Sequence, residues 1–213
     1  MTRVRLLVAD DHAVVRQGIR QILSDAPEVE VVAEATNGLE AIEIVRGGDV
    51  DVVILDLSMP GLSGIETVKK LRQDHPDVPV LVLSMHPEEQ YAVRVMRTGA
   101  AGYLTKDGAP EELVAAVRSV ARGHKYVTST LAERLAHELE RGSDKLPHEV
   151  LSDREYQVML LMAEGLSGRD IAERLTLSAK TVSTYRARLL HKMNMSSNVE
   201  LIRYALRQGL IEA

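Results

Sequence analysis

The chain has 213 residues, 45% of them hydrophobic, a length that suits two globular domains better than one. It contains no cysteine, which excludes disulfide bonds and thiolate metal sites. The net charge of −5 is divided unevenly: residues 1–149 carry 17 Lys and Arg against 24 Asp and Glu, whereas residues 150–213 carry 9 against 7. An acidic first part and a mildly basic second part indicate different partners for the two halves.

The N-terminal apolar run differs from a targeting signal. It covers only residues 4–9 and ends in Asp10 and Asp11, so it is too short and too quickly acidic for a signal peptide or a membrane span. We therefore expect a soluble cytoplasmic protein that does not bind a membrane.

Up to about residue 122, short β-branched apolar runs alternate with longer amphipathic segments. This pattern is typical of a parallel sheet that is buried on both faces by helices. Five such units predict a doubly wound α/β domain with a five-stranded parallel sheet over residues 1–122. Strands are predicted at Val4–Ala9, Val29–Ala33, Val52–Asp56, Val80–Ser84 and Gly102–Thr105, and helices at Ala13–Ala26, Gly38–Val45, Ile65–His75, Glu88–Thr98 and Glu111–Arg122.

Four of the predicted strands end on, or just before, a reactive side chain: Asp10 with Asp11, Asp56, Ser84 and Lys106. Binding crevices of open α/β sheets lie at the carboxyl ends of the strands, so these side chains are expected to converge. Three carboxylates suit Mg²⁺. With the metal in place, Asp56 can act as a carboxylate nucleophile and form an aspartyl phosphate. Lys106 would pair with the phosphoryl oxygens, and the Ser84 hydroxyl could donate to the same group.

Residues 123–147 have a different character. The leucines of Leu131–Leu139 have helical spacing, and the polar stretch Glu140–Glu149 contains glycine and proline. We predict a short helix followed by a flexible linker.

The last segment, residues 148–213, has the pattern of a small all-α domain of four helices. Ser152 and Glu155 form the pattern of a capping box, and Gly165 is placed to end that helix. A second helix begins at Ser167 or Gly168, Ser178 caps a third, and Val199–Gln208 forms a fourth. The tight turn over residues 176–178, between two helices, predicts a helix-turn-helix.

The first domain resembles the receiver domain of two-component response regulators, which has the CheY-like, flavodoxin-like fold. The resemblance covers residues 4 to about 122. The segments that carry it are Val8-Ala9-Asp10-Asp11-His12, Asp56-Leu57-Ser58-Met59-Pro60-Gly61, Leu83-Ser84 and Gly102-Tyr103-Leu104-Thr105-Lys106.

The resemblance implies a role for each residue of this set. Asp11 and Asp56 would ligate Mg²⁺ directly, Asp10 would assist through water, and the Ser58 carbonyl would add a ligand. Asp56 would take its phosphate from a sensor histidine kinase, so the domain would catalyse only its own phosphorylation and dephosphorylation. Tyr103 would be the switch aromatic, which rotates inward when Ser84 moves toward the phosphate.

Some positions vary or depart from the receiver pattern. Asp107 follows the lysine where many receivers have proline, and the switch hydroxyl is Ser84 rather than threonine. Ser58 and His86 are expected to tune the dephosphorylation rate. The seven histidines show no metal-ligand spacing, and His12 is interpreted as part of the loop.

The second domain resembles the LuxR-type DNA-binding domain, so the whole chain is similar to response regulators of the NarL/FixJ family. The segments that carry this resemblance are Leu151-Ser152-Asp153-Arg154-Glu155, Ala163-Glu164-Gly165-Leu166-Ser167, Asp170-Ile171-Ala172-Glu173-Arg174-Leu175 and Leu177-Ser178-Ala179-Lys180-Thr181-Val182. The segments Ser183-Thr184-Tyr185-Arg186 and Ser196-Ser197-Asn198-Val199-Glu200-Leu201 are similar to the GacA-like branch.

The third helix of this domain is the candidate recognition helix for double-stranded DNA. Lys180 and Thr181 begin it, where backbone amides and a cation favour phosphate. Arg188, together with Arg186, is predicted to read guanine, and Lys192 is predicted to contact the DNA backbone. Helical spacing places Ser183, Thr184, Ala187 and Arg188 toward solvent, within reach of base edges.

Phosphorylation would add roughly −1.5 to −2 charges at Asp56 and so bias a two-state equilibrium. We expect release of the DNA-binding domain, homodimerisation, or both. Two-fold dimers favour inverted half-sites about 10 bp apart or a multiple of that spacing.

Three alternatives compete with this interpretation. An aspartyl-phosphate phosphatase of the haloacid-dehalogenase type would need a second Asp two residues after the nucleophile, and that position is Ser58. A phosphorylation-independent DNA-binding protein with a degenerate receiver is disfavoured by the intact acidic set. A helical protein-interaction scaffold would leave the arginines of the second domain as a solvated face.

Overall fold

The computed structural model describes residues 3–141 and 146–211, and the chain divides into two compact units, Met1–Ala136 and His137–Ala213. Among the described helices, none is both long and apolar enough to cross a membrane.

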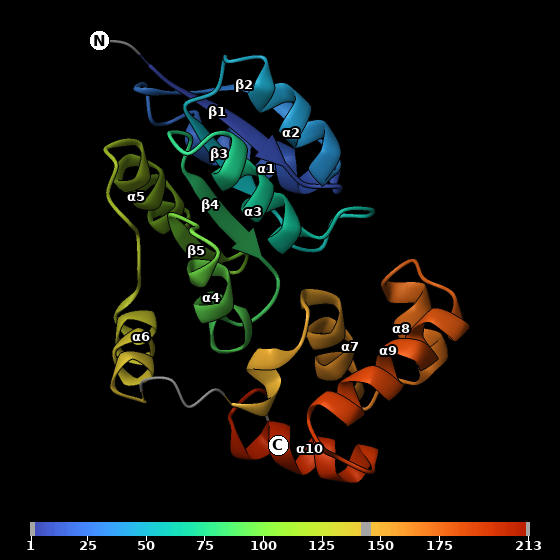
Figure 1. Ribbon diagram of the computed structural model, residues 1–213. Coiled ribbons are helices and arrows are strands. Elements are labelled where there is room, and N and C mark those ends of the chain that lie inside the picture. Colours follow the sequence, from blue (N-terminus) through green and yellow to red (C-terminus); the bar gives the residue numbers. More distant parts are fainter. Residues whose placement is uncertain (1–2, 142–145, 212–213) are drawn as a thin grey trace. The chain divides into compact units, whose positions relative to one another are not determined.

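The first unit is built on a five-stranded parallel sheet in the order β2-β1-β3-β4-β5 (Figure 1). This confirms the predicted doubly wound sheet. Because β2 and β3 lie on opposite sides of β1, the winding reverses there, and the crevice opens at the carboxyl ends of β1 and β3. The strands are β1 (Val4–Ala9), β2 (Val29–Ala35), β3 (Val52–Leu55), β4 (Val80–Ser84) and β5 (Gly102–Thr105).

Helices cover both faces of the sheet, as the near-continuous apolar strands require (Figure 1). On one face, residues such as Ile19 of the first helix and Val117 of the fifth pack on Leu6, Val8 and Ile54 in one hydrophobic cluster. The other three helices lie on the opposite face. The helices are α1 (Ala13–Leu23), α2 (Gly38–Arg46), α3 (Gly64–Asp74), α4 (Glu88–Arg97) and α5 (Pro110–Ala121).

The first unit continues past residue 122, where the receiver-like segment was predicted to end. Tyr126 forms an isolated parallel bridge with Gly102 at the sheet edge. Thr128 then caps α6 (Ser129–Arg141): its hydroxyl accepts the amide of Leu131 and donates to Glu88 of α4, at 2.7 Å. The first turns of α6 are thus fastened to the start of α4. In the predicted linker, residues 142–145 lie outside the described part of the chain.

The second unit contains the four predicted helices, preceded by a short 3-10 turn that was not predicted. Serine side chains cap α7, α8, α9 and α10, each accepting the amide three residues on. Between α8 and α9, Thr176 adopts the left-handed conformation (φ 53°), which allows the tight turn of a helix-turn-helix. The elements are η1 (Pro147–Val150), α7 (Asp153–Ala163), α8 (Gly168–Arg174), α9 (Ala179–Lys192) and α10 (Asn198–Arg207).

Candidate functional site

The predicted reactive side chains of the first unit converge at the carboxyl ends of the strands. The Lys106 ammonium, which follows β5, lies 2.6 Å from Oδ2 of Asp10 and 2.9 Å from Oδ2 of Asp56. Asp10 and Asp56 are each only 2% exposed. One ammonium therefore faces two buried carboxylates, which leaves the buried group with an excess negative charge.

Asp56 has unused hydrogen-bonding capacity. Among the described residues, none meets strict hydrogen-bond geometry at its Oδ1 or Oδ2, although the Lys106 ammonium lies 2.9 Å from Oδ2 and the backbone amide of Ser58 also acts on the carboxylate. Buried polar atoms are rarely left in this condition unless a ligand or a reaction uses them. The carboxylate that the sequence analysis names as the nucleophile is thus the one whose oxygens remain available.

The pKa values of this pair reflect its burial. Burial raises the pKa of Asp56 above that of an ordinary aspartate, and the nearby ammonium of Lys106 offsets only part of this effect. Burial lowers the pKa of Lys106, but the carboxylates of Asp10 and Asp56 outweigh it, so the lysine pKa is raised. Lys106 is therefore a permanent cation at neutral pH.

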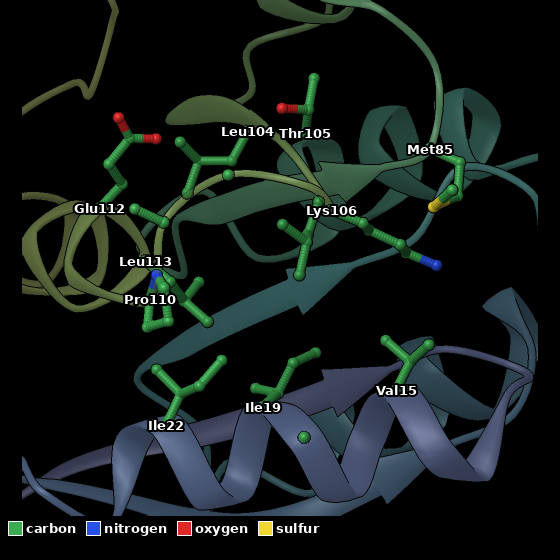
Figure 2. A pocket seen from close by; sticks show the side chains of 14 residues that line it. Val15, Ile19, Ile22, Met85, Leu104, Thr105, Lys106, Pro110, Glu112 and Leu113 are labelled. Atoms are coloured by element: carbon green, nitrogen blue, oxygen red, sulfur yellow. The ribbon is translucent and has the colours of Figure 1, made fainter.

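An apolar cavity of about 280 Å³ lies between α1 and α5, behind the lysine (Figure 2). Figure 2 shows the Lys106 side chain at one end of this cavity, with the ammonium turned away from Ile22 and Leu113. The Lys106 side chain is only 8% exposed, and this burial strengthens the attraction between the charges.

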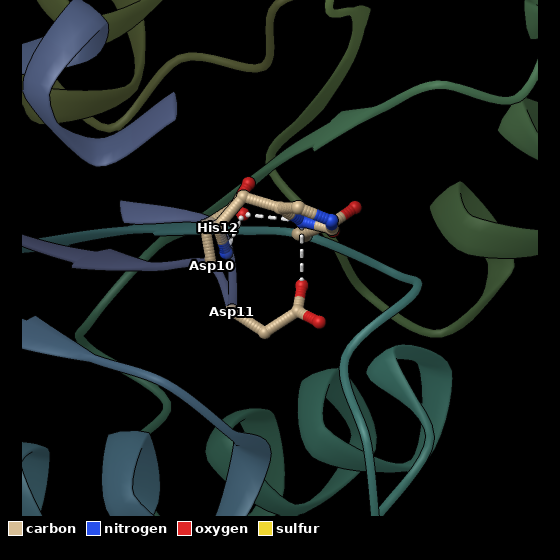
Figure 3. A group of neighbouring side chains, drawn as sticks. Asp10, Asp11 and His12 are labelled. Atoms are coloured by element: carbon tan, nitrogen blue, oxygen red, sulfur yellow. Dashed lines mark hydrogen bonds and ion pairs between the residues drawn. The ribbon is translucent and has the colours of Figure 1, made fainter. Parts of the chain in front are cut away.

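Asp11 and His12 complete the acidic group (Figure 3). The Nδ1 atom of His12 lies 2.9 Å from Oδ1 of Asp11 and 3.4 Å from Oδ1 of Asp10, and the His12 amide donates to that same Asp10 oxygen at 2.8 Å. Donor atoms of Asp10, Asp11, His12 and Asp56 all lie within 4.8 Å of one another. His12 lies on the loop, as predicted, but the contact of its ring with the carboxylates was not predicted.

The donor set suits a hard divalent cation. Three carboxylates, one of them with free oxygens, supply the ligands that Mg²⁺ prefers, and one positive charge from Lys106 leaves them incompletely neutralised. The Ser58 position lies two residues beyond Asp56, on the loop between β3 and α3. The structure thus brings the predicted metal ligands to the same end of the sheet.

The predicted switch residues, Ser84 at the end of β4 and Tyr103 in β5, are connected through His86 on the loop after β4. The Ser84 hydroxyl accepts the amide of His86 at 3.1 Å, and the Tyr103 hydroxyl donates to the carbonyl of His86 at 2.7 Å. Tyr103 is fully buried, and its predicted role as the switch aromatic stays a prediction. Burial also raises the pKa of Tyr103, which keeps its hydroxyl protonated.

The two variable positions are also in contact. The Ser58 hydroxyl lies 3.3 Å from Nε2 of His86, and the imidazole stacks on Tyr91 with ring centroids 4.4 Å apart. These two side chains therefore bridge the loops that follow β3 and β4, beside the Asp56 carboxylate. Their predicted effect on dephosphorylation stays a prediction.

In the second unit, α9 carries the predicted DNA contacts on an exposed surface. The side chains of Ser183, Thr184, Ala187 and Arg188 are exposed, as helical spacing predicted, and so is Lys180 at the start of the helix. Among the described residues, none forms an ion pair with Arg188 or Lys180. These cations are therefore available to a nucleic acid.

Four predicted contact residues have partners within the unit, among them Thr184, whose hydroxyl donates to the carbonyl of Lys180 at 3.0 Å. The Thr181 hydroxyl meets that of Ser178 in the helix cap. Nε of Arg186 donates to Asn198 at 3.0 Å. The Lys192 ammonium donates to the buried Glu155 at 2.7 Å, a contact between residues far apart in the sequence that their local patterns do not reveal.

Comparisons with known families cover both units. The family described as response regulator receiver domain matches residues 6–118, and the family described as bacterial regulatory proteins, luxR family, matches residues 149–205. The response regulator UvrY of Escherichia coli (strain K12) is 42% identical over 211 residues, which cover 99% of this chain and 97% of UvrY. The response regulator GacA of Pseudomonas aeruginosa is 38% identical over 211 residues, covering 99% of each chain.

Solved structures agree with this assignment. RcsB from Salmonella enterica serovar Typhimurium, bound to promoter rprA in the presence of the phosphomimetic BeF3-, matches with a TM-score of 0.64 and 28% identity over 95% of this chain and 98% of that one. A structure of two RcsB dimers bound to two parallel DNAs matches with a TM-score of 0.59 and 28% identity, covering 99% of this chain and 100% of that one. The chain belongs to the NarL/FixJ-type response regulators, which join a receiver domain to a LuxR-type helix-turn-helix domain.

Proposed function

We propose that this protein is a transcription regulator whose DNA binding is controlled by phosphorylation of Asp56. The observation that carries the proposal is the buried Asp56 carboxylate, which shares the single Lys106 ammonium with the Asp10 carboxylate and so keeps lone pairs for a further ligand. Family membership supports the reaction class, and the arrangement of side chains supports the roles proposed below.

The Asp56 carboxylate is the nucleophile. One of its oxygens forms a bond to phosphorus while the bond between phosphorus and the imidazole nitrogen of a sensor histidine kinase breaks, and the imidazole leaves. Lys106, 2.9 Å from Oδ2 of Asp56, is placed to pair with the phosphoryl oxygens. The Ser84 hydroxyl accepts the amide of His86, and its own hydrogen can be donated to the same phosphoryl oxygens.

A divalent cation completes this site. Asp10, Asp11 and Asp56 would hold it, with the carbonyl of Ser58 as a further ligand. Mg²⁺ supplies positive charge that offsets the carboxylates and the incoming phosphoryl oxygens. No separate substrate is turned over: the receiver catalyses only the phosphorylation and dephosphorylation of its own Asp56.

The output is binding of double-stranded DNA by the α8–α9 helix-turn-helix. The exposed Lys180 and Arg188 support this role, and RcsB, a structural relative, has been solved as dimers on DNA. We infer that the phosphorylated protein forms a homodimer and favours inverted half-sites in promoters. A regulator of chromosomal promoters acts in the cytoplasm.

The test uses the full chain and acetyl phosphate with Mg²⁺ as phosphodonor. Wild type is expected to gain one phosphoryl group that alkali and hydroxylamine remove, and Asp56→Ala none, while Asp74→Ala, which changes an exposed aspartate on α3, labels like wild type. Gel shifts on genomic fragments with and without phosphodonor then measure the output. Labelling of Asp56→Ala on another carboxylate would contradict the assignment of the phosphoacceptor.

A further inference from the structure

One buried carboxylate joins two helices of the DNA-binding unit. Glu155 lies in the first turn of α7, with its side chain only 4% exposed. Its Oε2 atom accepts the amide of Ser152 at 2.8 Å and the ammonium of Lys192 at 2.7 Å. The oxygen that completes the capping box of α7 therefore also holds Lys192, the last residue of α9.

The Lys192 ammonium stabilises the ionised form of the buried Glu155 carboxylate. Burial raises the pKa of Glu155, but the hydrogen bonds from Lys192 and Ser152 outweigh burial and lower it below the usual glutamate value, so the group is ionised. An ionised carboxylate that loses its partner in a buried place is strongly destabilising. Moving the ammonium from Glu155 to a DNA phosphate would incur this cost.

The ion pair lies next to the surface that α9 offers to DNA. Arg188 stands four residues before Lys192, so the two side chains share one face of the helix, about one turn or roughly 6 Å apart along the axis. Fastening the end of α9 to α7 restricts sliding and rotation of the helix. Bidentate contacts between arginine and guanine depend on such placement.

We propose that Lys192 is a positioning residue: its ion pair with Glu155 sets the position of the recognition helix, and Lys192 makes no contact with DNA phosphate. The proposal rests on the proposed function, because it requires α9 to bind DNA. It replaces the sequence-based prediction that Lys192 contacts the DNA backbone with a different role for the same cation.

Salt dependence separates the two roles. Each phosphate that the protein neutralises contributes about −0.9 to the slope of log K against log salt concentration. The experiment measures this slope by fluorescence anisotropy for the full-length protein on a random-sequence 30-bp duplex and on a duplex enriched by wild type from a random library. Lys192→Met is expected to keep the wild-type slope, whereas Lys180→Met, the matched control on the exposed start of α9, is expected to make it shallower by about 0.9 for each phosphate that is no longer neutralised.

Affinity provides the second readout. Lys192→Met is expected to bind the enriched duplex on the order of tenfold more weakly, about the effect of removing one contact to a base, and the random duplex with little change. Lys192→Arg, which keeps the ion pair, should bind like wild type. Glu155→Gln removes a negative charge, which by charge alone would tighten DNA binding; disturbed positioning predicts weaker binding to the enriched duplex.

Several outcomes would overturn the proposal. A shallower slope for Lys192→Met, like that of Lys180→Met, would show that Lys192 contacts phosphate, and unchanged affinity for the enriched duplex would show that it positions nothing. If Lys192→Met does not fold by circular dichroism, the double variant Glu155→Gln/Lys192→Gln, which buries no unpaired charge, is held to the same criteria. If wild type itself binds neither duplex, the proposed function fails, and that result is distinct from a change in slope.

Discussion

Replacing Gly64 with alanine is expected to impair phosphorylation of Asp56 without altering any group that reacts. Gly64 begins α3 and lies against the backbone that carries Asp56. A Cβ atom at this position would lie 2.4 Å from the Cα atom of Leu57 and 2.9 Å from the carbonyl oxygen of Asp56. Carbon atoms in ordinary contact are about 3.5–4.0 Å apart, so the two backbones would have to separate by roughly 1 Å.

The size of the effect follows from this displacement. Forcing one extra carbon into a packed junction costs about 1–3 kcal/mol of unfolding free energy. A shift of about 1 Å at a reacting group can slow a reaction on the order of 100-fold. Gly64→Ala should therefore lower the urea midpoint of the receiver and slow its labelling by acetyl phosphate by about two orders of magnitude, with the loss in rate larger than the loss in folded fraction.

The assay follows labelling over time by phosphate-affinity gel electrophoresis, with urea unfolding monitored by circular dichroism. Gly18→Ala is the matched control: Gly18 lies inside α1, and its added Cβ would meet no atom within 4 Å. That change is expected to stabilise α1 by about 0.5–1 kcal/mol and to leave labelling unchanged. If Gly64→Ala labels at the wild-type rate with an unchanged midpoint, the junction has room for a side chain and the close-approach argument is wrong.

Three further predictions concern other contacts. Lys106→Met leaves two buried carboxylates without their cation and should lower the unfolding free energy by up to about 3–5 kcal/mol, a loss that protonation of a carboxylate would reduce. Urea unfolding in EDTA measures this loss, and added Mg²⁺ should restore part of the stability. An unchanged urea midpoint would contradict the prediction. Because Glu155 has a lowered pKa when folded, its ion pair stabilises above the unfolded pKa of 4.5 and is lost as pH falls through the folded value. The unfolding free energy of Glu155→Gln should therefore depend less on pH between about 3 and 5 than that of wild type, and parallel curves would refute this. Thr128→Val removes the cap of α6 and the hydrogen bond to Glu88, at a cost of about 1 kcal/mol. Amide hydrogen exchange should become faster in residues 129–136 and stay unchanged in the sheet. An exchange rate that is unchanged in residues 129–136 would show that the cap does not stabilise the start of α6.

Local patterns predicted most of the elements because their causes are local. The runs of β-branched residues and the serine caps act within a few positions, so strands such as β1 and β4 begin and end at the predicted residues, and α9 begins directly after its predicted cap, Ser178. The convergence of Asp10, Asp56 and Lys106 could also be predicted, since parallel strands must bring their carboxyl ends to one edge.

The contacts that were not predicted join residues that lie far apart in the sequence and are related by no helix or strand repeat. Thr128 donates a hydrogen bond to Glu88, 40 residues away in the sequence, and Lys192 donates one to Glu155, 37 residues away. No spacing rule selects such partners, because the packing of helices decides which long side chains come within reach. The continuation of the first unit through Tyr126 belongs to the same class, since it depends on a bridge to Gly102.

The balance of charge distinguishes the site that reacts from the ion pair that positions. At the receiver site, one ammonium serves the two buried carboxylates of Asp10 and Asp56, so negative charge and lone pairs remain for a cation and for a phosphoryl group. At the other site, one ammonium serves the single buried carboxylate of Glu155, whose Oε2 also accepts a backbone amide. Among the described residues, no atom of Glu155 is a buried polar atom that lacks a hydrogen-bond partner. The same pairing of a lysine with a buried acid therefore produces an open, reactive centre in one domain and a closed structural tie in the other, and the number of carboxylates per ammonium decides which.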